Sequence, residues 1–345
     1  MNDFITINDR KIGSNFPPYI IAEMSANHNG DISNAFKIID MAKSSGADCV
    51  KLQTYTPDTL TIDSKLPDFQ LTEGLWGGQS LYELYKDAFM PWEWHQPLFD
   101  YAKKIGITIF SSPFDNTAVD LLEDLNTPAY KIASFEAVDL PLIKYVAQTG
   151  KPMIISTGMA DAEEIQEAIE AARDGGCKEL AILHCVSGYP APAGDYNLRT
   201  LVDMQEKFGL VTGLSDYTTS NLACFGAVFF EKHFTLDNNL AGPDHWFSEN
   251  PESLKDWVES IHQSYQMMGD ALVRPTSKEL EMRKLARRSI VILKDTKQGD
   301  KLTEENIGLR RAGNGLAPIF IKDMLGSFAS QDLVEGNLLE LKNVQ

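Results

Sequence analysis

The sequence has few cysteines, and they are scattered without the spacing of a paired motif. Cys49, Cys177, Cys185 and Cys224 are the four in 345 residues, and none belongs to a CxxC pair. Two lie in apolar runs that predict strands, and two lie near the ends of predicted helices. We therefore expect reduced, mostly buried thiols and no disulfide framework.

Long apolar runs and an excess of basic residues are also missing. No run reaches membrane-spanning length, and the N-terminal MNDFITINDRKIG lacks the apolar core of a signal peptide. The chain has 49 acidic and 31 basic residues, a formal net charge of -18. This balance argues against nucleic acid or an anionic membrane as the main partner, and it allows an anionic substrate only where the site concentrates positive charge. We predict a cytoplasmic protein.

A further absence decides between two α/β folds. No G-x-G-x-x-G turn follows the first predicted strand, which argues against a doubly wound dinucleotide-binding sheet. Apolar, β-branched runs instead alternate with segments of helical periodicity. The predicted strands are Tyr19–Ser25, Cys49–Tyr55, Ile107–Ser112, Ala129–Ser134, Pro152–Thr157, Leu180–Cys185, Leu210–Ser215 and Ala227–Phe234. The predicted helices between them include Ser33–Ser45, Trp94–Ile105, Thr117–Leu125, Leu140–Gln148, Ala162–Asp174, Asn197–Phe208 and Ser220–Phe225.

Eight strands alternating with helices over roughly 250 residues predict a (β/α)8 TIM barrel, here residues 1–270. The pattern changes after that barrel. The charged, helical segment Thr276–Arg288 predicts a linker over 271–286. Short strand-like pieces, SIVIL at Ser289–Leu293 and LLEL at Leu338–Leu341, alternate with turns in the remainder. We predict a separate small domain over 287–345.

The segment between the second and third predicted strands is about fifty residues longer than a normal barrel loop. It contains GLWGGQSLYELY (Gly74–Tyr85) and PWEWH (Pro91–His95). Aromatic stripes of this kind often belong to a core. Because this one follows the C-terminal end of a barrel strand, where substrate loops lie, we predict a substrate loop.

Charged and polar residues occur at the ends of otherwise apolar strands. Glu23 with Ser25, Lys51 with Gln53, and Glu231 with His233 are pairs two residues apart, which share a strand face. The run AYKIASFE adds Lys131 and Glu136. A buried charge is costly unless it is paired or lines a polar cavity, so a structural ion pair is the alternative interpretation. Repetition on several strands favours one shared site for a polyhydroxylated, anionic substrate, with lysines neutralising its phosphate or carboxylate.

The motifs at these positions resemble the sialic acid (nonulosonic acid) synthase family over nearly the whole chain. They are IIAEMSANHNG, GADCVKLQTYTPDTLTID, SSPFD, AYKIASFEA, PMIISTGM, LHCVSGYP, GLSD, EKHFTLD and GPDH. In the tail, RRSIV and RRAGNG resemble the small antifreeze-like (SAF) domain of these enzymes. TYTPDTLTID, the GLW to LYELY segment, PWEWH and KIASFE most resemble the pseudaminic acid synthase branch.

The resemblance implies a carbon–carbon bond-forming transferase. Phosphoenolpyruvate would condense with an open-chain acetamido sugar and water, releasing phosphate, with Mn²⁺ or Mg²⁺ as Lewis acid. The product implied is pseudaminic acid. N-acetylneuraminate or legionaminate synthesis, a catalytically decayed sugar-acid binding protein, and an aldolase forming a Schiff base through Lys51 or Lys131 are the alternatives.

The resemblance also implies roles for particular residues. Those matching the catalytic set are Glu23, Glu136 and His233. Those matching the phosphoenolpyruvate-binding set are Lys51, Ser112, Lys131, Ser134, Ser156 and Ser215. Those matching the sugar-binding set are Asn27, Gln53, Tyr189, Asp244 and Arg311. Arg311 would reach the site of a partner subunit, which implies a domain-swapped homodimer in which this arginine acts in trans.

The expected metal site departs from the family pattern. His233 matches one metal-binding histidine, but Tyr217 stands where the second is expected after GLSD. A neutral tyrosine is a poor ligand for Mn²⁺ because its proton has a pKa of about 10. We hypothesise that His245 or a water molecule takes the place of the missing imidazole.

Overall fold

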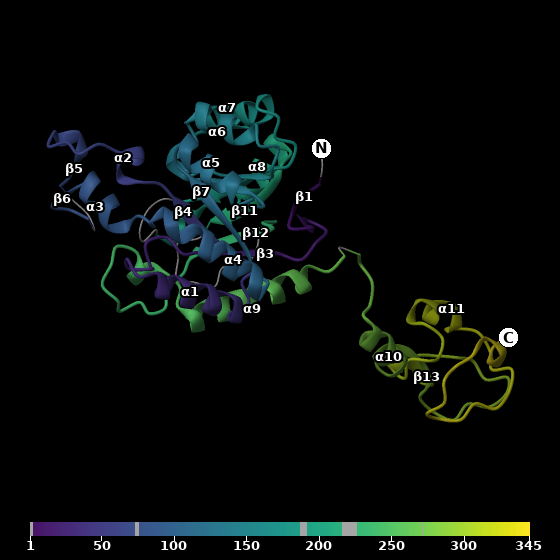
Figure 1. Cartoon of the computed structure of the whole chain (residues 1–345). Coiled ribbons are helices and arrows are strands. Elements are labelled where there is room, and N and C mark those ends of the chain that lie inside the picture. Colours follow the sequence, from purple (N-terminus) through teal and green to yellow (C-terminus); the bar gives the residue numbers. More distant parts are fainter. Residues whose placement is uncertain (1–2, 73–75, 187–191, 216–225, 271) are drawn as a thin grey trace. The chain divides into compact units, whose positions relative to one another are not determined.

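The structure, a computed structural model, describes residues 3–72, 76–186, 192–215, 226–270 and 272–345 (Figure 1). It divides into two compact units, Met1–Gly269 and Asp270–Gln345, which are described separately below. The predicted helix at Ser220–Phe225 lies outside the described residues. No helix in the described parts of the chain is long and apolar enough to cross a membrane.

Eight parallel strands close into a barrel in the first unit, and each strand pairs with the next barrel strand in the chain. The predicted (β/α)8 fold is therefore confirmed. The barrel strands are β3 (Tyr19–Glu23), β4 (Cys49–Thr54), β7 (Thr108–Pro113), β8 (Tyr130–Ile132), β9 (Met153–Ser156), β10 (Leu180–Cys185), β11 (Val211–Ser215) and β12 (Phe229–His233). β8 is shorter than predicted because the chain turns into a 3-10 helix at Ser134–Glu136.

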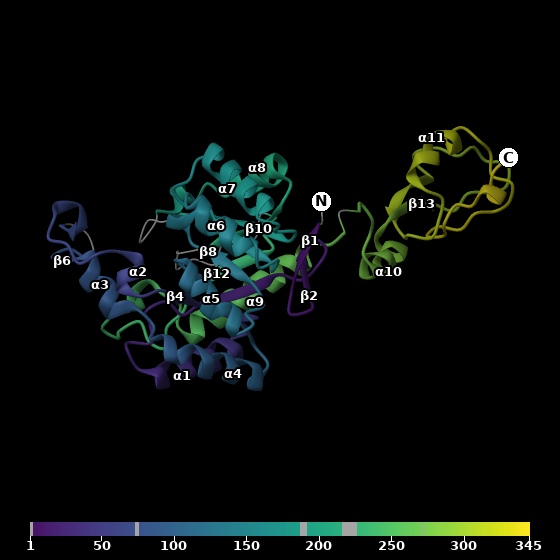
Figure 2. The same ribbon diagram turned by 45° about the horizontal axis from the view of Figure 1, so that its top comes forward.

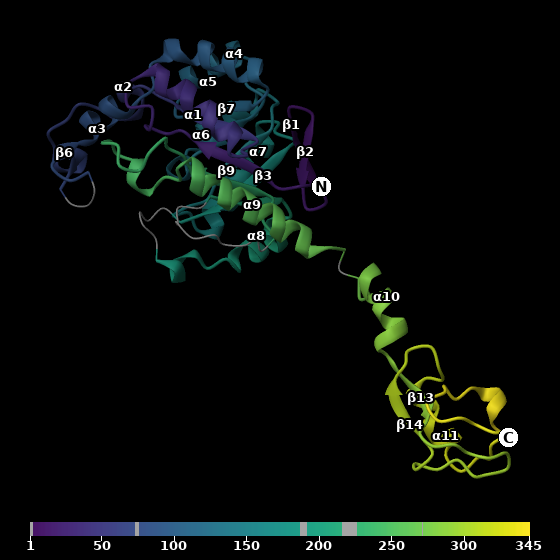
Figure 3. The same cartoon turned by 90° about the horizontal axis from the view of Figure 1, so that it is seen from below.

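Helices surround this barrel. They are α1 (Ile32–Ser44), α4 (His95–Ile105), α5 (Asn116–Asp124), α6 (Leu140–Ala147), α7 (Ala162–Asp174), α8 (Thr200–Phe208) and α9 (Pro251–Met268). In α1 the buried residues Ala35, Ile38, Ile39 and Ala42 have helical spacing and make one apolar face. Figure 3 shows α1 lying beside α4 and α9.

The interior of the barrel changes from apolar to ionic along its length. On β3, Tyr19 and Ile21 belong to a buried apolar cluster, and Glu23 follows on the same face. A hairpin of β1 (Phe4–Ile7) and β2 (Arg10–Gly13) adds Ile5, Ile7 and Ile12 to that cluster. Figure 2 shows the hairpin on the side of the unit away from β6. The apolar residues thus fill the N-terminal end and leave the C-terminal end for charged side chains.

The long segment between β4 and β7 folds into its own small group of elements (Figure 1). These are α2 (Pro57–Leu60), β5 (Gln70–Leu71), β6 (Gln79–Ser80), α3 (Leu81–Ala88) and 3-10 turns at Pro67–Phe69 and Trp92–Trp94. Ser80 begins α3 with a capping box, because its hydroxyl accepts from the Glu83 N–H while the Glu83 carboxylate accepts from the Ser80 N–H.

The second unit is built around an antiparallel strand pair. Its elements are α10 (Ser277–Ala286), β13 (Arg288–Ile292), β14 (Ile307–Arg311), α11 (Ile321–Met324) and 3-10 turns at Pro318–Phe320 and Leu341–Asn343. The helix in the charged segment and the strand at SIVIL are confirmed. The strand-like interpretation of LLEL is wrong. Leu338 makes only an isolated bridge to Val291, and Leu341 begins a 3-10 turn.

Three of the four cysteines lie in described parts of the chain. Cys49, Cys177 and Cys185 are free and buried, which confirms the expected reduced thiols for these three. Cys224 lies outside the described residues.

Candidate active site

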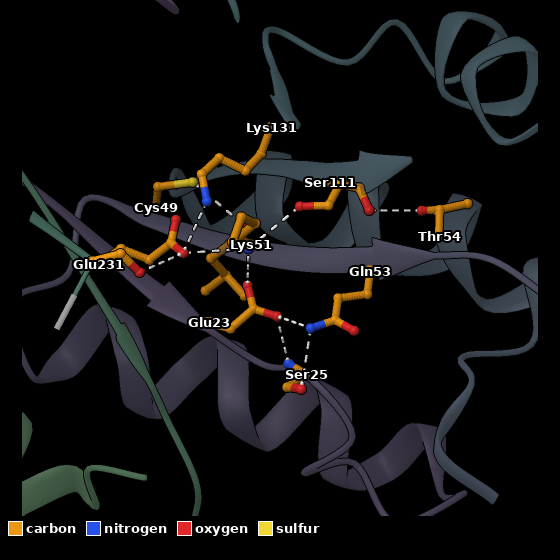
Figure 4. Close-up of polar contacts among 12 residues, drawn as sticks. Glu23, Ser25, Cys49, Lys51, Gln53, Thr54, Ser111, Lys131 and Glu231 are labelled. Atoms are coloured by element: carbon orange, nitrogen blue, oxygen red, sulfur yellow. Dashed lines mark hydrogen bonds and ion pairs between the residues drawn. The ribbon is translucent and has the colours of Figure 1, made fainter. Parts of the chain in front are cut away.

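Strand register brings four buried charged side chains together at the C-terminal end of the barrel. Glu23 on β3 is directly opposite Lys51 on β4, and their Oε2 and Nζ atoms are 2.7 Å apart. The Lys51 Nζ also lies 3.4 Å from Oε1 of Glu231 on β12. The Lys131 Nζ, from β8, lies 3.2 Å from the same oxygen. Figure 4 shows Lys51 between the two glutamates.

Two serine hydroxyls also contact this ionic cluster. Lys51 donates to the Ser112 Oγ at 3.3 Å, and the Ser215 Oγ donates to Glu231 Oε1 at 3.3 Å. Both serines are buried, and Ser215 is directly opposite Glu231 in the pairing of β11 with β12. A single glutamate oxygen therefore accepts from groups on three different strands.

Burial and pairing set the protonation of these groups. Burial disfavours the charged form of Lys51, but Glu23 and Glu231 outweigh it and raise the lysine pKa above its ordinary value. For Lys131, burial is the larger effect, and it lowers the pKa although Glu231 opposes it. Burial also disfavours the Glu231 carboxylate, yet the two lysines hold its pKa below the usual range. The charged forms therefore depend on one another.

A second polar chain runs from Glu23 toward the mouth. The Gln53 Nε2 donates to Glu23 Oε1 at 3.0 Å and to the Ser25 Oγ at 3.2 Å. The Ser25 hydroxyl in turn donates to Asp244 Oδ2 at 2.5 Å. Ser25 has φ of 46°, in the left-handed region, and such strain in a non-glycine residue is common at functional sites.

These groups form the floor of a cavity of about 390 Å³. Its polar lining includes Ser25, Lys51, Gln53, Lys131, Ser134, Glu136, Ser156, Glu231, His233 and Asp244. Glu136 Oε2 and the Ser156 Oγ are buried and have no hydrogen-bond partner among the described residues. Burial raises the pKa of Glu136 to about 7, with Asp139 adding to the shift and Lys131 opposing it. Buried polar atoms without partners in a cavity are ready to bind a polar ligand.

The opposite wall of the cavity is apolar and comes mostly from the long segment after β4. It includes Tyr55, Leu60, Leu71, Trp76, Leu81, Leu84, Tyr85, Ala88, Phe114, Phe135 and Phe247. On α3, Leu81, Leu84, Tyr85 and Ala88 have the spacing of one helix face. The cavity thus joins an ionic floor to an apolar wall.

Only part of the predicted aromatic substrate loop reaches this cavity. Trp76 to Tyr85 contributes to the wall, whereas residues 73–75 lie outside the described residues. The PWEWH part packs elsewhere: the Trp92 Nε1 donates to the Tyr55 carbonyl at 3.2 Å, and the Trp94 ring meets the His28 ring edge-to-face at 5.4 Å. His95 Nε2 hydrogen-bonds with Thr54 Oγ1 at 2.8 Å. PWEWH therefore fits the alternative interpretation, a segment that packs against the core. Its Trp92 and His95 side chains hydrogen-bond at the C-terminal end of β4.

The three predicted metal-binding residues are placed very differently. His233 lines the cavity, with its ring 5.1 Å from that of Phe247, and burial lowers its pKa to about 4. Tyr217 lies outside the described residues. His245 is not among the lining residues. Its Nδ1 hydrogen-bonds with Thr235 at 2.6 Å and its Nε2 with Asn29 at 2.9 Å, an arrangement that favours a structural role. Within the described ranges, no three His, Cys, Asp or Glu side chains are grouped to hold a metal ion.

Three predicted sugar-binding residues are not brought to the cavity by the described structure. The Asn27 amide donates to the Phe234 carbonyl at 3.0 Å and to the Ser248 Oγ at 2.9 Å, so it joins two loops. Arg311 ends β14 in the second unit and is exposed. Tyr189 lies outside the described residues. Of the rest of that group, Gln53 and Asp244 line the cavity.

Glu231 is the residue to which the sequence assigned no role. Its position two residues before His233, on the same predicted strand, already indicated that the two side chains share one strand face. Charge balance was the second signal, because two buried lysines need more than one buried carboxylate.

Comparison with known proteins places this geometry in a family context. The sequence matches the NeuB family over residues 38–272 and the SAF domain over residues 287–345. It is 44% identical over 334 residues to a pseudaminic acid synthase of Helicobacter pylori, covering 95% of this chain and 98% of that protein. A pseudaminic acid synthase of Campylobacter jejuni is 41% identical, with 95% and 96% covered. The crystal structure of the spore coat polysaccharide biosynthesis protein SpsE of Bacillus subtilis matches with a TM-score of 0.68 and 33% identity, covering 99% of each chain.

Proposed function

The chain belongs to the NeuB family, and we propose that it condenses phosphoenolpyruvate with an open-chain acetamido hexose and water to give pseudaminic acid, a nine-carbon acid, and phosphate. One observation carries this proposal beyond the likeness to relatives: a single cavity presents two buried lysines on its floor and an apolar stripe on its wall. The first suits a phosphorylated carboxylic acid, and the second suits a sugar with few hydroxyl groups.

We assign the phosphoenolpyruvate end to the floor. Lys51 and Lys131 supply positive charge, and Ser156 and Ser134 line the same cavity. Ser156 can donate to an anion without giving up another bond, because its Oγ has no partner in the described structure. Ser112 and Ser215 are not among the residues that line the cavity, and they act by holding the Lys51 ammonium and the Glu231 carboxylate.

The reaction needs one proton donor and one proton acceptor. Carbon 3 of phosphoenolpyruvate bonds to the aldehyde carbon, whose oxygen takes up a proton, and a water oxygen bonds to carbon 2 as it loses one. The bond from carbon 2 to the phosphate oxygen then breaks, the hydroxyl at carbon 2 gives its proton to the leaving phosphate, and carbon 2 becomes a ketone. Glu136, whose raised pKa of about 7 keeps a large neutral fraction, is the proposed donor to the aldehyde oxygen. Glu23, held by Lys51 and Gln53, is the proposed acceptor from water.

The apolar wall is the proposed binding surface for the sugar carbons that carry no hydroxyl. Asp244 and Gln53, at the edge of that wall, are placed to hydrogen-bond the hydroxyl and acetamido groups. A 6-deoxy sugar such as 2,4-diacetamido-2,4,6-trideoxy-L-altrose fits this division better than the more hydroxylated N-acetylmannosamine.

We also propose a divalent cation, Mn²⁺ or Mg²⁺, with His233 as a ligand. Of the predicted ligands, the described residues place only His233 in the cavity, so they do not by themselves make a metal site. The steps above therefore use side chains and water alone.

A homodimer is the proposed working form, with Arg311 of one chain completing the site of the other. Its support is the likeness of RRAGNG to the SAF pattern, together with the exposure of Arg311 at the end of β14. The described residues that line the cavity include no arginine.

Isotope labelling tests the chemistry directly. Phosphoenolpyruvate carrying ¹⁸O in the bridging oxygen is incubated with the altrose sugar, and the products are identified by mass spectrometry. We expect the label in inorganic phosphate and an unlabelled nine-carbon acid. Label retained in the acid would contradict the proposed carbon–oxygen cleavage, and the absence of any acid would contradict the synthase function.

A further inference from the structure

We propose that Glu231 is a positioning residue that exchanges its lysines with substrate phosphate. In the empty site its carboxylate holds Lys51 and Lys131, it yields them when the phosphate group binds, and it recovers them as phosphate leaves. The inference rests on the proposed function, because it takes the bound anion to be phosphoenolpyruvate. It adds a role for a residue that would act on the reacting groups through the two lysines.

The contacts of Glu231 are gathered on one oxygen. Oε1 lies 3.2 Å from the Lys131 Nζ, 3.4 Å from the Lys51 Nζ and 3.3 Å from the Ser215 Oγ. Oε2 is buried and has no hydrogen-bond partner in the described parts of the chain. The side chain is only 3% exposed, so solvent does not compensate its charge. Glu231 therefore needs the two lysines whenever no substrate is present.

The lengths of these contacts separate Glu231 from Glu23. Bonds between an ammonium and a carboxylate are ordinarily about 2.7–2.9 Å long. The Glu23–Lys51 contact, at 2.7 Å, meets that length, whereas all three contacts to Glu231 Oε1 exceed it. Three donors sharing one acceptor cannot all reach their best geometry. Glu23 thus anchors Lys51, and the longer Glu231 contacts are the ones that a phosphate oxygen can replace.

Of the two lysines, Lys131 is the one whose ion pairing depends most on Glu231. Glu231 is the one carboxylate within ion-pair distance of its Nζ among the described residues, and both side chains line the cavity. An arriving phosphate therefore meets an ammonium whose sole carboxylate contact is a long one. Because the buried carboxylate stays close to the bound phosphate, the two anions repel each other. That repulsion weakens phosphate binding and favours release of the product phosphate.

The inference predicts that removal of the Glu231 charge changes phosphate affinity in the opposite direction from removal of a residue that only holds the lysines in place. If Glu231 only held the lysines in place, its removal would weaken anion binding. If it competes with phosphate, Glu231→Gln keeps an oxygen acceptor, removes the competing charge and tightens anion binding. We expect inorganic phosphate to bind Glu231→Gln about tenfold more tightly than the wild type.

Isothermal titration of the full-length protein with inorganic phosphate measures this. A pH of about 6 is chosen because burial lowers the pKa of Lys131 from its ordinary value, and a low pH favours the charged form of both lysines. Glu249→Gln is the matched control, because Glu249 is a buried carboxylate paired with a lysine, Lys232, and is not among the lining residues. Its phosphate affinity should equal that of the wild type. Unchanged or weaker binding by Glu231→Gln would overturn the inference.

A second measurement covers the case in which Glu231→Gln does not fold. A crystal structure of the wild type with inorganic phosphate should show the Lys131 Nζ nearer to a phosphate oxygen than to Glu231. Phosphate bound with both lysines still on Glu231 would contradict the exchange and leave the synthase proposal intact. A wild-type protein that binds neither phosphate nor phosphoenolpyruvate would overturn both.

Discussion

At the residue scale, the site depends on charges that are buried in pairs. Glu23, Lys51, Lys131 and Glu231 are all at most 5% exposed, and none would stay charged there without its neighbours. Strand register places them: Glu23 faces Lys51, and His233 faces Glu23, across adjacent strands. A substitution that removes one charge therefore acts on substrate binding and on its partners together.

Lys131→Met removes one of the two proposed phosphate-binding cations and keeps a side chain of similar length. We expect kcat/KM for phosphoenolpyruvate to fall about 10-fold to 100-fold, because a hydrogen bond to a charged group contributes about 1.5–3 kcal/mol. Phosphate-release kinetics measure it. Lys151→Met is the control, since Lys151 pairs with Glu123 away from the cavity. An unchanged KM for phosphoenolpyruvate in Lys131→Met would contradict its role.

The proposed role of Glu136 as a proton donor predicts that kcat/KM for the sugar falls as the pH rises. Burial raises the pKa of this acid to about 7, so its neutral, proton-donating form prevails below that pH and is lost above it. With saturating phosphoenolpyruvate, kcat/KM for the sugar should fall about tenfold per unit above pH 7. Glu136→Gln should be slower and should lack this descending limb. A rate that rises through pH 7 would make Glu136 a base, and a limb that persists in the variant would assign it to another group.

Sequence reasoning reached these residues unevenly. Lys51 and Lys131 stand out because a lysine in an apolar strand needs an explanation. Glu231 was left without a role because its partners lie on three other strands, and only the register of the barrel brings them to one oxygen. His245 stood out as an additional histidine near the missing ligand, but spacing could not show that Thr235 and Asn29 occupy both its nitrogens.

At the scale of elements, α3 is the feature that separates this cavity from a purely ionic one. It has no fully buried residue, and its apolar stripe lines the cavity instead of joining the core. An apolar face that is neither in the core nor fully in solvent is an expected binding surface.

Leu84→Asn places an amide of similar size on this stripe. We expect kcat/KM for the 6-deoxy altrose sugar to fall about 10-fold to 100-fold, because loss of one apolar contact is worth about 1–3 kcal/mol in discrimination. KM for phosphoenolpyruvate should not change. Ile62→Asn, at a residue of the same segment that is 59% exposed and not in the lining, is the matched control. Equal losses in both variants would show that the stripe does not select the sugar.

The elements were predicted well where periodicity is long and poorly where it is short. The eight barrel strands and α7 follow from apolar runs and helical spacing. The β1–β2 hairpin was not predicted, although Asn8 and Asp9, with φ of 47° and 62°, form the kind of two-residue turn these residue types favour. PWEWH was taken for a substrate segment because composition does not tell which way a side chain points once a long segment folds back.

At the scale of the whole molecule, the two units have separate cores, and the proposed site needs both. The first unit holds the ionic floor and the apolar wall, and the second carries Arg311. The matches to the NeuB family and the SAF domain follow the same division. Sequence alone could identify both parts, because each has its own motifs, but it could not place one relative to the other.

Subunit mixing tests whether Arg311 acts in trans. Arg311→Ala and Lys131→Met should each be nearly inactive alone. After dissociation and reassociation together, half of the dimers combine one chain of each kind, and one of their two sites is intact. We expect about a quarter of wild-type activity to return. If the mixture stays as inactive as its components while mixed dimers form, Arg311 does not complete the site of a partner chain.

The most direct test of the proposed function is phosphate release from phosphoenolpyruvate with a panel of acetamido sugars. The panel comprises 2,4-diacetamido-2,4,6-trideoxy-L-altrose, the corresponding precursor of legionaminate and N-acetylmannosamine, each with Mn²⁺ and with EDTA. The proposed function predicts rapid release with the altrose sugar, loss of activity with EDTA and its return with Mn²⁺. Turnover only with another sugar would contradict the substrate assignment, and phosphoenolpyruvate binding without turnover of any sugar would contradict the synthase function itself.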